Sequence, residues 1–235
     1  MLKITTFLIL LIQASFVFAS CLSDDQIKQL EKQEIEYLSQ KIPPAFKHGL
    51  SSNSIKLAIE KVDSDCKARL IVELPQSDID EANAVLDAQP AKKIMLGAQG
   101  YVLPQETKHE AIFNVKDDKI TITEADILQT APLGKLRASL ELMYAFLTQK
   151  RAEVTSIQTN DKAWPKEITQ QEIADCSANQ PGADCACIAN EYASKIPANQ
   201  MEYIQYIRTN PYALAMGSSQ AYEEIKLQAS KACAG

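Results

Sequence analysis

Glycine and histidine are scarce in this chain of 235 residues, which contains seven glycines and two histidines. So few glycines leave no phosphate-cradling loop, and Gly97-x-x-Gly100 matches neither common nucleotide-binding pattern. The histidines, His48 and His109, lie far from the cysteines in the sequence and do not complete a zinc motif. We therefore expect neither a cofactor nor a metal site.

Recognisable catalytic motifs are also lacking. Gly217-Ser218-Ser219 lies at the start of a predicted helix and does not match the G-x-S-x-G turn of serine hydrolases. His109 and Glu110 are neighbours on a predicted strand, where adjacent side chains point to opposite faces. We therefore assign no catalytic residue and favour a protein that is not an enzyme. A cell-envelope hydrolase stays an alternative, because the two carboxylates of a glycosidase can lie anywhere in a sequence.

Basic residues are fewer than acidic ones, 24 against 30, which gives a net charge of −6. Lys3 is the one charged residue within residues 1–19, so the rest of the chain has 23 basic residues, 30 acidic residues and a net charge of −7. An acidic chain without a basic run is a poor partner for nucleic acids or anionic membranes. After residue 19, no apolar run approaches the roughly 20 residues that a membrane-spanning helix needs.

The first 19 residues have the three zones of a secretory signal peptide. Lys3 supplies positive charge, residues 7–12 form the apolar stretch, and Ala19 precedes the predicted cleavage site. We therefore expect export, with a mature protein that is periplasmic or secreted. The alternative is a lipoprotein, since the four residues that end at Cys21 resemble a lipidation motif. Lipid on Cys21 would leave an odd number of cysteines for disulfides.

Residues 20–155 are predicted to form an α+β domain with an antiparallel sheet built from hairpins and with packed helices. Ser23 and Gln26 form a capping box, which predicts a helix up to about Lys41. Apolar and polar residues alternate with a period of two within residues 55–74, on both sides of a polar turn. This pattern is typical of a β-hairpin with one buried and one solvent-exposed face.

The same arrangement of hairpin and helix is predicted a second time. Residues 111–122 alternate around a second acidic turn, and a helix follows from about Gly134. A shorter helix is predicted over residues 77–88. The segment 93–103 is predicted to add an edge strand to the sheet, centred on residues 101–103.

Residues 156–167 are polar and are predicted to form a linker, after which residues 168–235 form a small disulfide-stapled all-α module. Asn199 and Glu202 form a capping box for one of its helices. Three short helices are predicted there, over residues 184–196, 200–209 and 219–233.

Six cysteines in an exported chain predict three structural disulfides. They are Cys21, Cys66, Cys176, Cys185, Cys187 and Cys233. On one helix, Cys185 and Cys187 point about 200° apart, so they do not bond to each other. Cys185 and Cys233 both lie on apolar stripes. The expected pairs are therefore Cys185–Cys233, Cys187–Cys176 and Cys21–Cys66.

Cys185-x-Cys187 has two further interpretations. A vicinal pair of cysteines can cycle between dithiol and disulfide, so a thiol-disulfide enzyme is an alternative function. A metal site is less favoured, because no histidine lies nearby in the sequence.

Five of the eight tyrosines lie in the last 60 residues. Tyr192 and Tyr222 fall on apolar stripes and are predicted to be buried. Tyr203, Tyr206 and Tyr212 are the candidate binding residues, since tyrosine is favoured at interfaces. The sequence thus favours a non-catalytic periplasmic binding protein, of the inhibitor or immunity type, whose partner is another protein.

Overall fold

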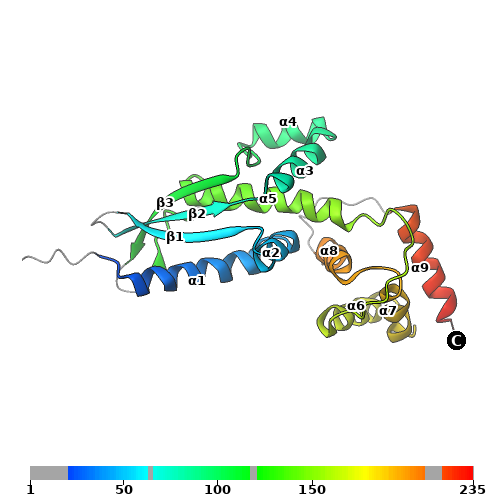
Figure 1. Cartoon of the computed structure of the whole chain (residues 1–235). Coiled ribbons are helices and arrows are strands. Elements are labelled where there is room, and N and C mark those ends of the chain that lie inside the picture. The colour runs from blue at the N-terminus through cyan, green and yellow to red at the C-terminus, as the bar shows by residue number, and fades with distance from the viewer. Residues whose placement is uncertain (1–20, 63–65, 117–120, 210–218, 235) are drawn as a thin grey trace, which may run out of the picture.

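The computed structural model describes residues 21–62, 66–116, 121–209 and 219–234. The predicted signal peptide lies outside the described residues. The chain has an α+β part followed by a helical part that bears two of the disulfides (Figure 1). The predicted fold class is confirmed.

The first helix, α1 (Asp24–Lys41), begins at the predicted capping box. The Ser23 side chain accepts a hydrogen bond from the Gln26 amide, and the Gln26 side chain accepts one from the Ser23 amide. Glu34 interrupts the apolar face of α1 and is nevertheless buried. Its carboxylate is compensated by the guanidinium of Arg137, which donates two hydrogen bonds to it.

Four described strands form one antiparallel sheet in the order β1-β2-β3-β4. They are β1 (Lys56–Val62), β2 (Lys67–Glu73), β3 (Lys108–Lys116) and β4 (Thr121–Ile122). Both predicted hairpins are confirmed, since β1 pairs with β2 and β3 pairs with β4. β3 also pairs with β2 along residues 108–114, so the two hairpins join into a single sheet.

The predicted edge strand at residues 101–103 is wrong. Residues 90–98 form a helix, α4 (Pro90–Ala98), and residues 101–103 connect it to β3 without joining the sheet. The Val102 carbonyl accepts a hydrogen bond of 2.6 Å from the Ser139 hydroxyl instead of a strand amide. This segment therefore contacts a helix and not a strand of the sheet.

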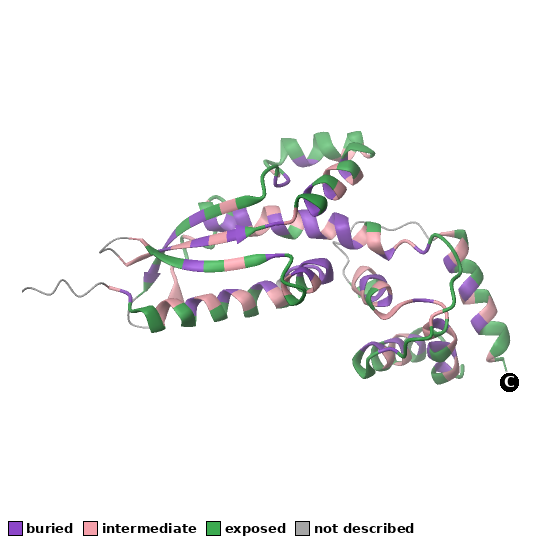
Figure 2. Ribbon diagram, viewed as in Figure 1, coloured by how far each residue is buried: buried purple, intermediate pink, exposed green. Residues whose placement is uncertain are grey.

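A long helix, α5 (Pro132–Ala152), forms the centre of the molecule. It contacts β3, α2 (Pro44–Ser51) and α3 (Gln76–Asp87), and it also contacts the helical part. Figure 2 shows buried residues along much of its length. Its largest buried side chains are Leu133, Leu140, Met143, Tyr144, Phe146 and Leu147.

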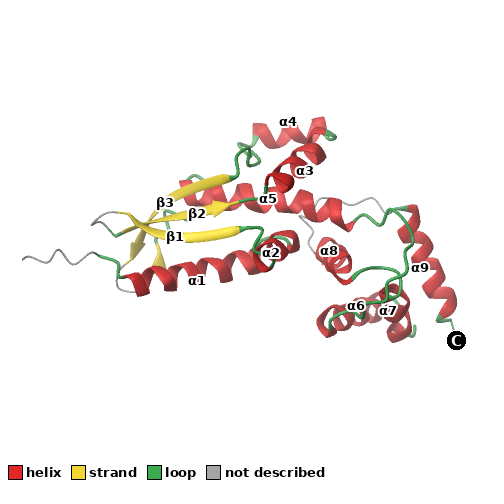
Figure 3. Ribbon diagram, viewed as in Figure 1, coloured by secondary structure: helices red, strands yellow, loops and turns green. Residues whose placement is uncertain are grey.

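The helical part is built from four described helices (Figure 3). They are α6 (Lys166–Asn179), α7 (Cys185–Ala193), α8 (Ala198–Thr209) and α9 (Gln220–Ala232). Helix α6 was not predicted, because its buried face contains Glu172 between Ile168 and Cys176 and so lacks an apolar stripe. The predicted cap at Asn199 is wrong, since α8 begins at Ala198 and includes Asn199.

The segment predicted as a linker packs against the helical part that follows it. Trp164 is buried, and its indole N–H donates a hydrogen bond of 2.7 Å to the Ile196 carbonyl. Gln200 donates to the Glu153 carbonyl at 2.9 Å, and Ser219 donates to the Val154 carbonyl at 2.5 Å. These contacts attach the helical part to the end of α5. Across the described residues, no helix has both the length and the apolar character of a membrane-crossing segment.

Replacing Gly134 by alanine is expected to destabilise the protein. A Cβ at this position of α5 would lie 2.0 Å from the Leu128 carbonyl oxygen, and backbone cannot move aside easily. We expect Gly134→Ala to lower the free energy of unfolding by about 1–3 kcal/mol, measured by urea denaturation.

Gly97→Ala is the matched control, because a Cβ at Gly97 in α4 would meet no atom within 4 Å. Alanine favours helix over glycine by about 1 kcal/mol, so this variant should be as stable as the wild type or more stable. Equal stability of the two variants would contradict the described contact between Leu128 and α5.

Candidate functional site

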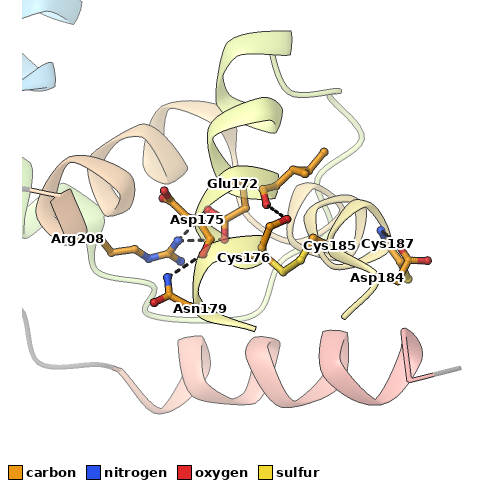
Figure 4. Close-up of a disulfide and its surroundings, with 10 residues drawn as sticks. Glu172, Asp175, Cys176, Asn179, Asp184, Cys185, Cys187 and Arg208 are labelled. Atoms are coloured by element: carbon orange, nitrogen blue, oxygen red, sulfur yellow. Dashed lines mark hydrogen bonds and ion pairs between the residues drawn. A yellow bond between two sulfur atoms is a disulfide. The ribbon is translucent and has the colours of Figure 1, made fainter. Parts of the chain in front are cut away.

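The disulfides of the helical part connect different cysteines from those predicted. Cys176 is bonded to Cys185, and Cys187 is bonded to Cys233 (Figure 4 shows the first pair). Cys185 does lie on the buried face of α7, but α6 supplies the partner on that side. Cys187 points to the other face of α7 and meets the end of α9, which contacts α7. The unpredicted helix α6 therefore explains the wrong pairing.

The predicted disulfide between Cys21 and Cys66 is confirmed. It ties the segment before α1 to the turn before β2, across 45 residues of sequence. A sulfur in a disulfide cannot also carry a lipid, so this bond and the lipoprotein alternative exclude each other.

The three candidate binding tyrosines differ in their surroundings. Tyr203 is buried, with 4% of its surface exposed, which contradicts the expected exposure. Tyr206 is partly exposed, and Tyr212 lies outside the described residues. Tyr192 and Tyr222 are buried, as predicted.

Tyr203 is buried because α8 packs against α2 and α5 at the junction of the two parts. His48 of α2 lies between two residues of α8: its Nδ1 is 2.8 Å from the Tyr203 hydroxyl, and its Nε2 is 2.7 Å from the Glu202 carboxylate. The hydrogen bond from His48 holds the pKa of Glu202 below its ordinary value. Burial raises the pKa of the Tyr203 hydroxyl. Sequence reasoning missed this cluster because its members lie 154 and 155 residues apart.

Polar contacts continue from this junction into α3 and α5. Arg151 donates hydrogen bonds to Asp78 at 2.6 Å and to Glu81 at 2.7 Å. The Tyr144 hydroxyl donates to the same Asp78 carboxylate at 3.1 Å, and burial raises its pKa. The junction is thus a satisfied polar network with a structural role.

A cavity of about 470 Å³ in the helical part contains two carboxylates, Glu172 and Asp175. Arg208 donates to both oxygens of Glu172, at 3.0 and 2.8 Å, and Gln205 also donates to this carboxylate (Figure 4 shows the pair of Glu172 with Arg208). Asp175 accepts from Gln171 at 2.8 Å. The acceptor positions of Glu172 are therefore occupied by the protein itself.

A larger open groove of about 720 Å³ lies beside β3. β3 forms one wall through His109 and Glu110, and helix α5 forms the floor through Lys135, Leu136, Ala138 and Ser139. Residues 99–102 and 129–130 form the rest of the wall. We take this groove as the candidate functional site.

Hydrogen bonds connect the walls of the groove to one another and to α5. Ser139 fixes Val102 above α5, and Gln129 donates to the Tyr101 hydroxyl at 3.4 Å. His109 lies 2.6 Å from the Glu106 carbonyl, on the core side of β3, whereas Glu110 is exposed on the other side. The prediction that His109 and Glu110 point to opposite faces of the strand is confirmed. Both residues line the groove because the groove runs along the edge of β3.

Apolar side chains project from the wall of the groove and from its surroundings. Val102 in the wall is 66% exposed, and Leu128, next to the wall residue Gln129, is 59% exposed. Ile94 on the preceding helix α4 is 74% exposed. Concave, largely apolar surfaces with a few polar groups are typical of binding sites. Among the described residues, no group of three or more His, Cys, Asp or Glu is placed to hold a metal ion.

The stability that Glu202 contributes is expected to depend on pH. Because the folded-state pKa of Glu202 is lowered, its contribution is present above the ordinary value of 4.5 and is lost as the pH falls through the lowered value. Glu202→Gln should cost about 1–2 kcal/mol at pH 7, measured by urea denaturation, and the cost should shrink below pH 4.5. Glu36→Gln is the control, since Glu36 is exposed and lies 3.9 Å from Lys32. A cost for Glu202→Gln that is independent of pH would contradict the His48–Glu202 contact.

Comparisons of the chain with protein-family models, with curated proteins and with solved structures found no match in any of the three.

Proposed function

We propose that this chain is an exported, non-catalytic binding protein of the periplasm or cell exterior, and that it acts on a protein partner as an inhibitor or immunity-type protein does. The groove beside β3 carries the proposal, because it combines a concave surface with exposed Val102 and Leu128 at its border. Exposed apolar groups that gather at one place on a surface mark interaction sites.

Two further features support binding over catalysis. The disulfides Cys21–Cys66, Cys176–Cys185 and Cys187–Cys233 pre-organise both parts of the chain, which lowers the entropic cost of binding a partner. The groove contains one acidic and one basic side chain, Glu110 and Lys135, so it does not favour a highly charged ligand.

The two alternative functions have weaker support. A thiol-disulfide enzyme would use Cys185 and Cys187 as one redox pair, but each is bonded to a different cysteine. A cell-envelope hydrolase would use Glu172 and Asp175, but Arg208 and Gln205 occupy the carboxylate of Glu172.

If the groove binds a protein partner, a charged residue placed in the groove should weaken that binding. The mature chain, tagged at its carboxy terminus, is incubated with envelope extract of its own host, and bound proteins are titrated to saturation. We expect one partner to saturate at a fixed ratio and Val102→Asp to weaken its binding at least roughly tenfold, since a buried unpaired charge is costly.

Leu227→Asp is the matched control, because Leu227 lies on α9 and is similarly exposed, at 54%. This variant should bind as the wild type does. Equal loss from both substitutions, or no saturable partner at all, would argue against the proposed function.

A further inference from the structure

The main-chain hydrogen bonds of β3 alternate between its two edges. The Leu74 amide donates to the Thr107 carbonyl at 2.7 Å, and the Val115 amide donates to the Cys66 carbonyl at 2.8 Å. In an antiparallel pair, residues two apart point their N–H and C=O groups to the same side. The odd-numbered residues of β3 therefore bond to β2, and the even-numbered residues point their main-chain groups to the opposite edge.

That opposite edge is covered only at one end. β4 pairs with β3 at Val115 and Lys116. The Thr123 amide donates to the Asn114 carbonyl, and the Asn114 amide donates to the Asp126 carboxylate. Beyond Asn114, the outward N–H and C=O groups of Lys108, Glu110 and Ile112 have no hydrogen-bond partner within the part of the chain that is described.

The opposite edge of the sheet, formed by β1, is covered by other parts of the chain, whereas within the described residues the outer edge of β3 is not. The outward amide of Ile59 in β1 donates a hydrogen bond of 3.2 Å to the Glu31 carboxylate of α1, and α1 packs along β1. Natural proteins usually block edge strands by such devices. An edge left open beside a groove is therefore a feature to explain.

The groove adjoins this open edge, because Glu110 lines it. Residues 99–102 and 129–130 form the remaining walls of the groove. An extended chain lying in the groove would offer the main-chain groups that Lys108, Glu110 and Ile112 leave unpaired. We propose that an extended segment of a protein partner adds to the sheet as a strand along Lys108–Ile112 of β3. This inference rests on the proposed function and specifies how the partner binds.

The surroundings of the edge define the chemistry of the segment. Side chains of an added strand would alternate between two faces. Those on one face would lie over α5 near Leu136 and Ala138 and should be apolar. Those on the other face would lie beside Lys108, Glu110 and Ile112, which favours polar or oppositely charged residues there. The expected ligand is therefore an alternating apolar and polar peptide of about five residues.

A phage-displayed library of random linear heptapeptides, selected on the full-length mature chain, supplies a defined probe. One selected peptide is synthesised, and its affinity is measured by fluorescence anisotropy for the wild type, Glu110→Pro and Glu110→Thr. Proline removes the outward N–H of residue 110 and projects its ring toward an added strand, without removing a bond to β2. We expect at least a roughly tenfold loss for Glu110→Pro and less than about a twofold change for Glu110→Thr.

Both variants lose the contacts of Glu110 with Lys108 and Arg69. The difference in their peptide affinities therefore measures the contribution of the outward N–H group of residue 110. Should Glu110→Pro fail to fold by circular dichroism, Ile112→Pro with Ile112→Thr tests the next outward amide in the same way. Failure to enrich any peptide, or equal affinity for the proline and threonine variants, would overturn the proposal.

Two results would distinguish strand addition by a partner from binding in another mode and from self-association. A captured envelope partner that binds Glu110→Pro as tightly as wild type would keep the binding function and overturn strand addition. A concentration-dependent dimer in analytical ultracentrifugation, abolished by Glu110→Pro, would assign the edge to a second copy of this chain and also overturn the proposal.

Discussion

The burial of α5 is the constraint on which the rest of the structure depends. This helix contacts β3 along one side, α2 and α3 along others, and α8 near its end. Helix α5 therefore packs against the sheet, the junction of the two parts and the groove alike. Gly134 at its start lets the Leu128 backbone approach closely, and Ser139 holds the wall of the groove. A rigid element below the groove fixes the spacing between the edge of β3 and the opposite wall.

Polar pairs hold the helices around α5 in their places. Glu34 of α1 pairs with Arg137 of α5, and Asp78 of α3 pairs with Arg151 of α5. Such buried pairs contribute little net stability against apolar residues of the same volume, but removal of one partner costs about 3–5 kcal/mol. Arrangements of the helices that separate the two partners of a pair are therefore penalised. The contact of His48 with α8 has the same role between the two parts.

Local patterns were sufficient to predict much of the fold. The capping box at Ser23, the alternation in both hairpins and the apolar face of α5 are all confirmed, because each is set by neighbouring residues. Helix α6 was missed because Glu172 lies in the middle of its buried face. The disulfide pairing then failed, since Cys176 was placed in a loop rather than on a helix facing α7.

The candidate site could not be predicted in the same way. The groove combines β3, α5 and two connecting segments, and only tertiary packing brings these together. The open edge of β3 is equally non-local, since it depends on β4 being only two residues long. Tyrosine content pointed instead to α8, where Tyr203 is buried against His48. Composition does not distinguish a tyrosine at an interface from one at a junction within the chain.

The most direct test of this account is amide hydrogen exchange of β3 in the free protein, resolved residue by residue by NMR. The account predicts alternation: the amides of His109, Ala111 and Phe113 exchange slowly because they bond to β2, while those of Glu110 and Ile112 exchange quickly. Slow exchange throughout residues 109–113 would show that the outer edge is already covered, and would contradict the account of an open edge beside the groove.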